Sequence, residues 1–409
     1  MHQASGERHR TTLMIISLTT NIGLLGFFKY FNFFAASLAD ALLTLGLEAN
    51  PITLNIILPV GISFYTFQTL SYTIDIYRRQ LEPTRDAVAF FAFVSFFPQL
   101  VAGPIERARN LLPQFLRPRI FDDVSARDGL RQILWGCIKK VVVADNIGLQ
   151  ADKVFADYGD YSGLTLVIGL FLFSVQVYCD FSGYSDIAIG TARLFGFNLM
   201  RNFAYPFFSR NITEYWRRWH ISLSSWFRDY LYIPMGGSRV PTWRKIVNIV
   251  TTFTISGLWH GASWHFVAWG FINGIYFIPG MLFKSKKYTA IVAMDRLFPN
   301  LKEFLQMILT FSIITFSLIF LRSDTLTDSW GFIRGFGQSG AHLQSTQVLL
   351  ALLYCALVIG IEWIQRRREH GLQIDHWPKA IRWVTYCILC ALFLAFGMFE
   401  ERAFYYFQF

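Results

Sequence analysis

The sequence predicts an all-α polytopic membrane protein, and three observations carry that prediction. Of the 409 residues, 54% are hydrophobic and only 16% are charged, and the mean hydropathy is +0.37. Aromatic residues make up 18% of the chain, which is more than the core of a soluble protein needs. Apolar runs recur along the whole length, and a helix needs roughly 20 apolar residues to cross the ~30 Å core of a bilayer.

The apolar runs give the expected elements in chain order. They lie at residues 11–28, 52–76, 87–101, 164–177, 246–258, 266–283, 304–321, 348–364 and 381–399. Several are long enough to span a bilayer and others are interrupted by proline, glycine or charge, so we expect roughly nine to eleven membrane helices, some of them re-entrant. The first run is expected to be an uncleaved span rather than a signal peptide, because it continues past Lys29. Without a linker or a repeat, residues 1–409 are expected to form a single integral membrane domain.

Residues 176–190 (QVYCDFSGYSDIAIG) differ from an ordinary span, because Asp180 and Asp186 interrupt their apolar pattern. An ionised aspartate at membrane depth costs about 3 kcal/mol unless it is paired or faces water. We therefore expect the two aspartates, together with Tyr178 and Tyr184, to satisfy one another inside the protein.

Residues 204–237 (AYPFFSRNITEYWRRWHISLSSWFRDYLYIPMGG) are aromatic and basic together. Tryptophan and tyrosine favour the headgroup layer, and irregular backbone at membrane depth needs cover from protein or a water-filled cavity. This segment is expected to form helices that lie at the interface or dip into the protein.

The net charge of +10 does not indicate a nucleic-acid partner, because the basic residues sit in short clusters between the apolar runs. The clusters are residues 78–79, 107–119, 139–140, 217–218, 244–245, 284–287 and 366–368. Such clusters are typical of cytoplasmic loops and of contacts with lipid headgroups, so membrane lipids are the expected contact and no nucleic acid is expected. The five scattered cysteines indicate neither a disulfide framework nor a metal site.

Two histidines in tryptophan-rich apolar stretches are the candidate catalytic residues. His220 lies in WRRWHISLS and His260 in ISGLWHGASWHF, with Trp259 beside it. A neutral imidazole at position 260 can remove a proton from an incoming hydroxyl. His220 can orient the donor, hydrogen-bond an oxyanion or share the proton. The alternative is that both are hydrogen-bonded core histidines. His265 is interpreted as a packing or interface residue.

Other catalytic templates fit less well. The sequence has no GxSxG, no HExxH and no glycine-rich phosphate loop. His370 and Asp375 have the HxxxxD spacing found in some glycerolipid acyltransferases, but they lie in a charged stretch without flanking motifs. So short a pattern often arises by chance.

Several phrases together resemble one family. They are ILPVGISFYTFQTLSYTIDIYR (57–78), FFPQLVAGPIERA (96–108), QVYCDFSGYSDIAIG, NITEYWRRWHISLSSWFRDYLYIPMGG, SGLWHGASW and the closing FYYFQF. In this order they are similar to the bacterial branch of the membrane-bound O-acyltransferases, which includes membrane subunits of alginate and peptidoglycan O-acetylation and of teichoic acid D-alanylation. The match runs from about residue 13 to residue 409.

The resemblance implies a central funnel of helices whose pore holds the active histidine. His260 takes the family's LWHG position and His220 its second histidine position, while Asp180, Tyr184, Asp186 and Trp259 become candidates for the funnel lining. It also implies an acyl donor such as acetyl-coenzyme A or another acyl thioester, with no bound cofactor. The acceptor is then a hydroxyl of a cell-surface or exported polysaccharide, reached across the bacterial inner membrane with a separate extracytoplasmic partner of the SGNH hydrolase type.

The two ends of the chain carry further expectations. Members of this branch usually have one or more spans before the stretch that resembles residues 13–34, so leading spans are expected to be missing here. In the aromatic ending, Tyr406 is a candidate to carry the acyl group briefly or to dock a partner, and an interfacial anchor is the alternative. Two other functions stay open: polysaccharide export or transport without acyl transfer, and acylation of a lipid or protein.

Overall fold

The computed structural model describes residues 6–48, 50, 52–283, 286, 288–400, 402, 404 and 405. Within these residues the secondary structure is helical, apart from one isolated bridge between Tyr161 and Ala341, which confirms the all-α prediction. The chain forms two compact units, Met1–Ile120 with Phe197–Leu199, and Phe121–Gly196 with Met200–Phe409. The single domain over residues 1–409 stays a prediction.

The first unit packs its helices partly through polar side chains. Its helices are α1 (Glu7–Leu25), α2 (Phe31–Thr44), α3 (Ile62–Tyr77), α4 (Ala87–Val94) and α5 (Ala108–Phe115). A π-helical turn joins α1 to α2, so that they form one apolar helix over Glu7–Thr44. Thr69 of α3 donates to Asn21 of α1 at 2.7 Å, and the hydroxyls of Ser17 and Thr73 are 3.1 Å apart.

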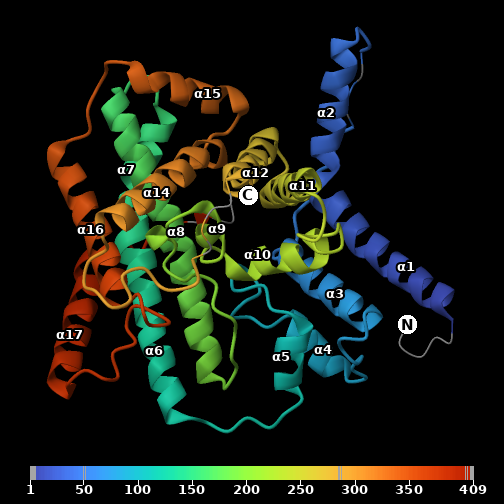
Figure 1. The fold of residues 1–409 in the computed structure, drawn as a ribbon, viewed down its shortest axis with the longest axis horizontal. Helices are drawn as coiled ribbons and strands as arrows, with labels where there is room; N and C mark the ends of the chain where they lie inside the picture. The colour runs from blue at the N-terminus through green and yellow to red at the C-terminus, as the bar shows by residue number, and fades with distance from the viewer. Residues whose placement is uncertain are drawn as a thin grey trace. The chain divides into compact units, whose positions relative to one another are not determined.

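The second unit is built around the long helix α8 (Figure 1). Its helices are α6 (Asp123–Cys137), α7 (Asp145–Ala156), α8 (Gly163–Leu194), α9 (Ile212–Trp216), α10 (Ile221–Phe227), α11 (Thr242–His260), α12 (Trp264–Ile275), α13 (Phe277–Leu282), α14 (Leu301–Arg322), α15 (Leu326–Arg334), α16 (Ser345–Ile364) and α17 (Lys379–Phe396). Ser162 caps α8, because its hydroxyl accepts from the backbone N–H of Thr165. At 1.5 Å per residue the 32 residues of α8 extend about 48 Å, which is more than the thickness of a bilayer core.

Glycines allow α6 and α8 to pack closely side by side. A Cβ atom at Gly129 would lie 2.7 Å from the carbonyl oxygen of Gly190, and one at Gly136 would lie 2.5 Å from that of Gly183. The two pairs run in opposite directions along the helices, so α6 and α8 are antiparallel. Helices in membranes commonly approach each other through such small residues, because lipid offers little hydrophobic drive to association.

Replacing Gly190 by alanine is expected to destabilise the second unit. The new methyl group would meet the backbone of Gly129 at 2.4 Å, and backbone cannot move aside as a flexible side chain can. Overpacking of this kind costs about 1–3 kcal/mol. The measurement is the thermal unfolding midpoint in detergent. Gly360→Ala in α16 is the matched control and should change little, because nothing lies within 4 Å of its added Cβ; equal midpoints for the two variants would contradict the close approach.

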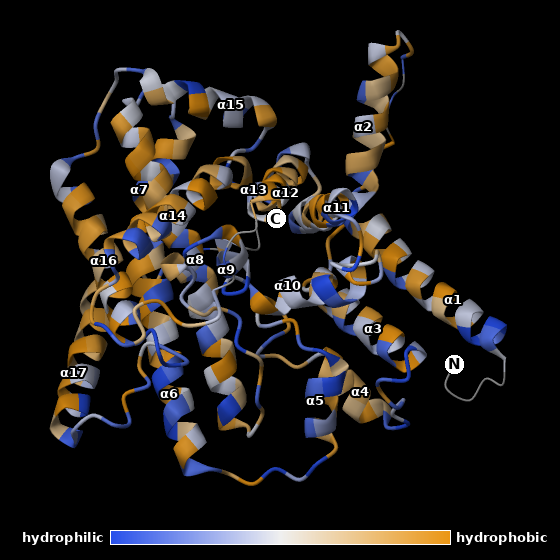
Figure 2. Cartoon of the chain, in the orientation of Figure 1, coloured by the Kyte–Doolittle hydropathy of each residue, from blue (hydrophilic) through white to orange (hydrophobic). Residues whose placement is uncertain are grey.

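Six helical segments among the described residues are long and apolar enough to cross a membrane, which makes the chain a membrane protein. They are Glu7–Thr44, Gly163–Leu194, Trp264–Leu282, Leu301–Arg322, Ser345–Ile364 and Lys379–Phe396. Figure 2 shows hydrophobic residues along α14, α16 and α17, and many of them are exposed, as contact with lipid requires.

Two of the expected runs form shorter helices than the sequence indicated. In the run 52–76 the helix begins only at Ile62, after Gly61 in the left-handed region at φ 75°. In the run 87–101 the helix ends at Val94, four residues before Pro98. Proline and glycine can end a helix within a run whose mean hydropathy stays high. Hydropathy alone therefore overestimates the length of the helices. The number of nine to eleven spans stays a prediction.

Candidate active site

A large cavity in the second unit contains both candidate histidines. It has a volume of about 860 Å³. Its walls come from α9, α10, α11 and α13 and from the segments that join them, and they include Trp216, Trp219, His220, Phe227, Lys245, Phe253, His260 and Lys286. His220 and His260 are 40 residues apart in the sequence, and the fold brings them to one chamber. A substrate of moderate size fits such a volume.

His220 is held by its backbone and by surrounding aromatic rings. It immediately precedes α10 in the left-handed region (φ 43°, ψ 56°), which is rare for a residue with a Cβ and costs about 1–2 kcal/mol. The ring of Phe181 from α8 lies 4.6 Å away at 81°, and the ring of Trp259 lies 6.3 Å away. Strained residues of this kind persist only where the surrounding structure fixes them, and they cluster at functional sites.

The loop before α10 ties His220 to α8 through a chain of hydrogen bonds. Asn202 accepts the backbone N–H of Ile221 on its carbonyl oxygen at 2.9 Å and the hydroxyl of Ser222 on Oδ1 at the same distance. Its side-chain amide then donates to Ser185 of α8 at 3.1 Å. These bonds orient the imidazole relative to α8 before any substrate binds.

Burial lowers the pKa of His220 well below its ordinary value, and the neighbouring His260 lowers it further. The side chain is only 2% exposed, so a charged imidazolium would lose most of its hydration. His220 is therefore neutral at physiological pH. A neutral imidazole has one N–H donor and one nitrogen acceptor, which suits it to orient a substrate oxygen.

His260 ends α11 and faces the cavity at the junction with α12. The ring of Trp269 from α12 lies 5.0 Å from the imidazole at 84°, and the ring of Trp259 lies at the same distance. The next residue, Gly261, has no room for a side chain, because a Cβ there would lie 2.1 Å from the ring of Phe266. The glycine of the LWHG sequence therefore permits the close turn that places His260 at the cavity wall.

The cavity wall combines aromatic faces with hydrogen-bond donors and cations. In the part of the chain that the structure describes, the buried indole N–H groups of Trp216 and Trp269 have no acceptor. An oxygen of a bound substrate can accept from Trp216, which lines the cavity. Lys245, Lys286 and Arg217 also line it, so the chamber favours an anionic ligand.

A sequence profile of the membrane-bound O-acyltransferase family matches residues 82–323, a segment that includes both histidines and all of the cavity. This chain belongs to the membrane-bound O-acyltransferase family. It is 38% identical to the probable alginate O-acetylase of Pseudomonas aeruginosa, over 80% of this chain and 61% of that protein.

Two further relatives place this family member in the bacterial branch that its motifs indicated. It is 32% identical to the peptidoglycan O-acetyltransferase of Helicobacter pylori, over 100% of this chain and 84% of that protein. The teichoic acid D-alanyltransferase of Streptococcus thermophilus is 28% identical over 66% of this chain and 69% of that protein. The chain spans between about half and three-fifths of the length of the alginate relatives that it matches.

The funnel candidates of this chain lie outside the lining of the large cavity. Asp180, Tyr184, Asp186 and Trp259 are all absent from its walls, although Trp259 packs behind both histidines. The expectation that the aspartates and tyrosines on α8 satisfy one another was wrong. Each of these carboxylates pairs instead with a lysine from the π-helical turn Ile138–Ala144, which packs against α8.

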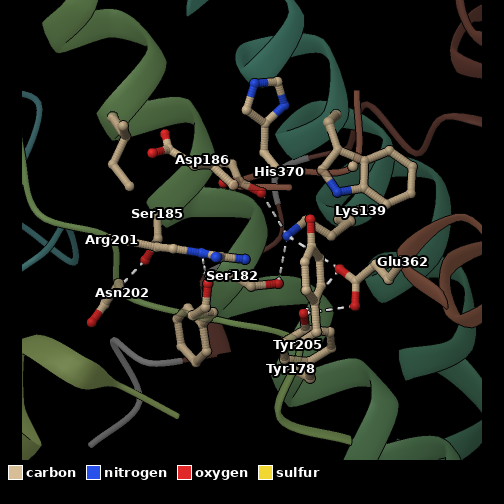
Figure 3. A pocket seen from close by; sticks show the side chains of 15 residues that line it. Lys139, Tyr178, Ser182, Ser185, Asp186, Arg201, Asn202, Tyr205, Glu362 and His370 are labelled. Atoms are coloured by element: carbon tan, nitrogen blue, oxygen red, sulfur yellow. Dashed lines mark hydrogen bonds and ion pairs between the residues drawn. The ribbon is translucent and has the colours of Figure 1, made fainter. Parts of the chain in front are cut away.

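The first of these pairs lies in a buried cluster, which Figure 3 shows. Lys139 lies 2.7 Å from Asp186 Oδ2 and donates to Ser182 Oγ at 2.8 Å. Glu362 of α16 lies 3.9 Å from the same ammonium group and accepts from the hydroxyl of Tyr178 at 2.8 Å. Lys139 is only 2% exposed, so the expected basic cluster at residues 139–140 is not a loop or headgroup contact. The two lysines neutralise carboxylates that an apolar helix could not otherwise hold.

The second pair, Lys140 with Asp180, holds the last described residues of the chain in place. Lys140 lies 2.7 Å from Asp180 and 2.7 Å from Asp145. The other oxygen of Asp180 accepts the backbone N–H of Tyr405 at 3.0 Å, and the ring of Tyr184 lies 5.2 Å from that of Phe404. Asp180 and Tyr184 therefore position the C-terminal segment. Tyr406, the candidate acyl carrier, lies outside the described residues.

His265 and His370 have structural partners. His265 is buried, and its Nδ1 lies 3.0 Å from the carbonyl oxygen of Phe320, in agreement with a packing role. His370 Nε2 lies 3.0 Å from Asp128 of α6, whereas Asp375 pairs with Arg131. His370 and Asp375 therefore serve separate contacts and do not form an acyltransferase pair.

Sequence reasoning missed the charged residues that hold α9 at the cavity wall. Glu214 pairs with Arg210 at 2.9 Å and with Arg218 at 2.7 Å, and its side chain is only 3% exposed. The i, i+4 spacing of the three residues in SRNITEYWRR is the signal that could have identified them. The two ion pairs of Glu214 hold α9, and with it Trp216, at the cavity wall.

Proposed function

We propose that this membrane-bound O-acyltransferase moves an acyl group, most simply acetyl, from a thioester donor to a hydroxyl of a cell-surface or exported polysaccharide. The observation that carries this proposal is that His220 and His260 line one cavity of about 860 Å³. Two relatives support the choice of acyl group and acceptor, because their names describe O-acetylation of alginate and of peptidoglycan. The family match covers every residue of the proposed site.

In the proposed reaction His260 acts as the general base. Its neutral ring nitrogen takes the proton of a sugar hydroxyl while the oxygen attacks the acyl carbonyl carbon. The new C–O ester bond forms, the C–S bond of the thioester breaks, and the sulfur leaves with the electron pair. The imidazolium of His260 then returns the proton to that thiolate. No metal or bound cofactor takes part in this step, and the acyl thioester is a substrate.

His220 is proposed to orient the donor and to stabilise the charge that develops on the carbonyl oxygen. Its lowered pKa keeps the ring neutral, so one ring N–H is available to donate to that oxygen. The strained backbone and the rings of Phe181 and Trp259 fix the direction of this donor. A fixed donor requires no reorganisation when the charge forms, which is the source of its catalytic effect.

The cations of the cavity support an anionic donor such as acetyl-coenzyme A. Lys245 and Arg217 lie on the same chamber as the histidines, so phosphate groups can bind there while the thioester reaches inward. The placement in the bacterial cytoplasmic membrane, the SGNH-type partner and a carrier role for Tyr406 are further parts of the proposal. The resemblance of the chain's motifs to the bacterial branch supports them.

The alternative, polysaccharide export without acyl transfer, is less well supported by the structure. The buried carboxylates that favoured a permeation path, Asp180 and Asp186, pair with lysines and lie outside the cavity. A permeation path would need polar groups that face an open passage.

Deleting the gene is expected to remove ester-linked acyl groups from the exported polysaccharide and to leave the amount of polymer unchanged, because the proposed reaction only decorates a finished chain. The measurement combines ester quantification after mild alkaline release with total sugar analysis. Complementation with the wild-type chain should restore the esters. Loss of the polymer itself would contradict the proposal and favour export.

A further inference from the structure

A second, much smaller void lies against His260 within the same unit. Its volume is about 20 Å³, compared with about 860 Å³ for the large cavity. His260, Trp216 and Trp219 line both spaces, so the two voids adjoin at the candidate general base. The remaining walls of the small void come from α8, α12 and α14 and include Val177, Phe181, Trp269, Asn273, Ile314, Ser317, Leu318 and Leu321.

The size of the small void limits what it can hold. A space that holds one water-sized probe has a volume of about 10–15 Å³ on the same measure. The void is only slightly larger, so it accommodates a methyl group and no longer alkyl chain. Its wall is mainly aliphatic and aromatic, and a void with such a wall favours an apolar group over water.

The side chains of Asn273 and Ser317, which both line the void, are hydrogen-bonded to each other and to backbone carbonyl oxygens. The side-chain amide of Asn273 donates to the carbonyl oxygen of Trp269 at 2.8 Å and to the hydroxyl of Ser317 at 3.2 Å. That hydroxyl donates in turn to the carbonyl oxygen of Ile314 at 2.7 Å. The bond between Asn273 and Ser317 connects α12 to α14 at the wall of the void, so the two helices cannot separate there without breaking it.

Resting on the proposed function, we propose that this void holds the methyl group of the transferred acetyl and thereby sets the length of the acyl group. The carbonyl carbon then lies at the junction of the two voids, beside His260, with the thioester sulfur toward the large cavity. Val177 and Leu318 act as specificity-determining residues, because both close the void and neither carries a group that reacts. A propionyl group would have to displace packed side chains of α8 or α14.

The size of the small void predicts how strongly the protein prefers acetyl over longer acyl groups. One additional methylene group changes selection in an apolar pocket by about 10–200-fold. Because rigid walls enclose the void, the wild-type chain should prefer acetyl over propionyl within this range and over butyryl more strongly still. Removing the isopropyl group of Leu318 should lower the preference for acetyl over propionyl by about tenfold or more.

The test compares Leu318→Ala with Ile319→Ala in cells that carry the natural acceptor. Both residues are buried on α14, at 4% and 0% exposure, but only Leu318 lines the void. Cells are grown with acetate, propionate or butyrate, and mass spectrometry measures the acyl esters on the exported polysaccharide and the intracellular acyl thioesters. The readout is the propionyl-to-acetyl ratio of the esters, divided by the same ratio in the thioester pool.

We expect this ratio to rise at least tenfold in Leu318→Ala and to stay at the wild-type value in Ile319→Ala. An active Leu318→Ala variant with the wild-type ratio overturns the inference and leaves the proposed function standing. Absence of every ester in the wild type contradicts the proposed function, and the inference falls with it.

If Leu318→Ala does not accumulate in the membrane, Val177→Ala takes its place. Its matched control is Val175→Ala, also buried on α8 but outside the void. The same rise in the ratio is expected for Val177→Ala, and an unchanged ratio overturns the inference.

Discussion

Replacing His260 by alanine is expected to lower acyl transfer by about 10²–10⁴-fold, the usual contribution of a positioned general base. The fold should survive, because His260 lies at the end of α11 and faces a cavity, so its loss enlarges a space that is already present. The measurement is the content of ester-linked acyl groups on the exported polysaccharide, normalised to the amount of the variant in the membrane.

Two glutamine variants make this experiment more specific. His260→Gln keeps a polar side chain of similar size that cannot take up a proton at neutral pH, so its loss of activity should match that of the alanine variant. His265→Gln is the control in the same apolar stretch, because His265 lines neither cavity and its ring pairs with a backbone carbonyl. Esters within a few-fold of wild type in a well-accumulated His260 variant would contradict the role of this residue.

Replacing Lys139 by methionine is expected to destabilise the second unit by about 3–5 kcal/mol, the cost of removing one partner from a buried ion pair. Methionine fills a similar volume but leaves the carboxylates of Asp186 and Glu362 without their cation (Figure 3). The measurement is the thermal unfolding midpoint in detergent, followed by intrinsic tryptophan fluorescence.

The control for this variant is Arg127→Met in α6, the helix that precedes the π-helical turn of Lys139. Arg127 pairs with Asp123 at 2.6 Å, but the two side chains are 69% and 61% exposed. Solvent screens such a pair, and an i, i+4 pair on a helix surface contributes about 0.3–0.5 kcal/mol. If both variants shift the midpoint equally, the cluster around Lys139 does not hold α8 and α16 together.

The sequence predicted the class of the fold and indicated the two candidate histidines because both leave local signals. Long apolar runs identify membrane helices, and a histidine among tryptophans is unusual in an apolar stretch. These signals could not show that His220 and His260 line one cavity, because that depends on how α9, α10 and α11 pack around it. The resemblance of the motifs supplied that expectation.

The partners of the buried aspartates could not be predicted from their own neighbourhood. Asp180 and Asp186 lie two turns apart on α8, whereas Lys139 and Lys140 are about 40 residues earlier. A basic doublet between two apolar stretches was interpreted as a headgroup contact. The glycines at 136 and 183 bring the two segments together, and this close approach is what places the lysines at the carboxylates.

The lining of the cavity also required the structure. The resemblance made Trp259 a candidate for the funnel lining, but successive residues of a helix point in different directions, and Trp259 contacts the histidines without lining this cavity. Much of the chamber is lined by residues of the aromatic and basic segment 204–237, which was expected to form helices that lie at the interface or dip into the protein.

The measurement that tests the reaction site most directly is a cryo-electron microscopy structure of the protein in lipid nanodiscs. The bound ligand is an acetyl-coenzyme A analogue in which a methylene group replaces the thioester sulfur. We expect density for the analogue in the large cavity. Its acyl carbon should lie beside His260, with space for a sugar hydroxyl at hydrogen-bond distance, roughly 2.6–3.2 Å, from the imidazole. Density for the analogue elsewhere, with His260 turned toward lipid and away from His220, would contradict acyl transfer at this site.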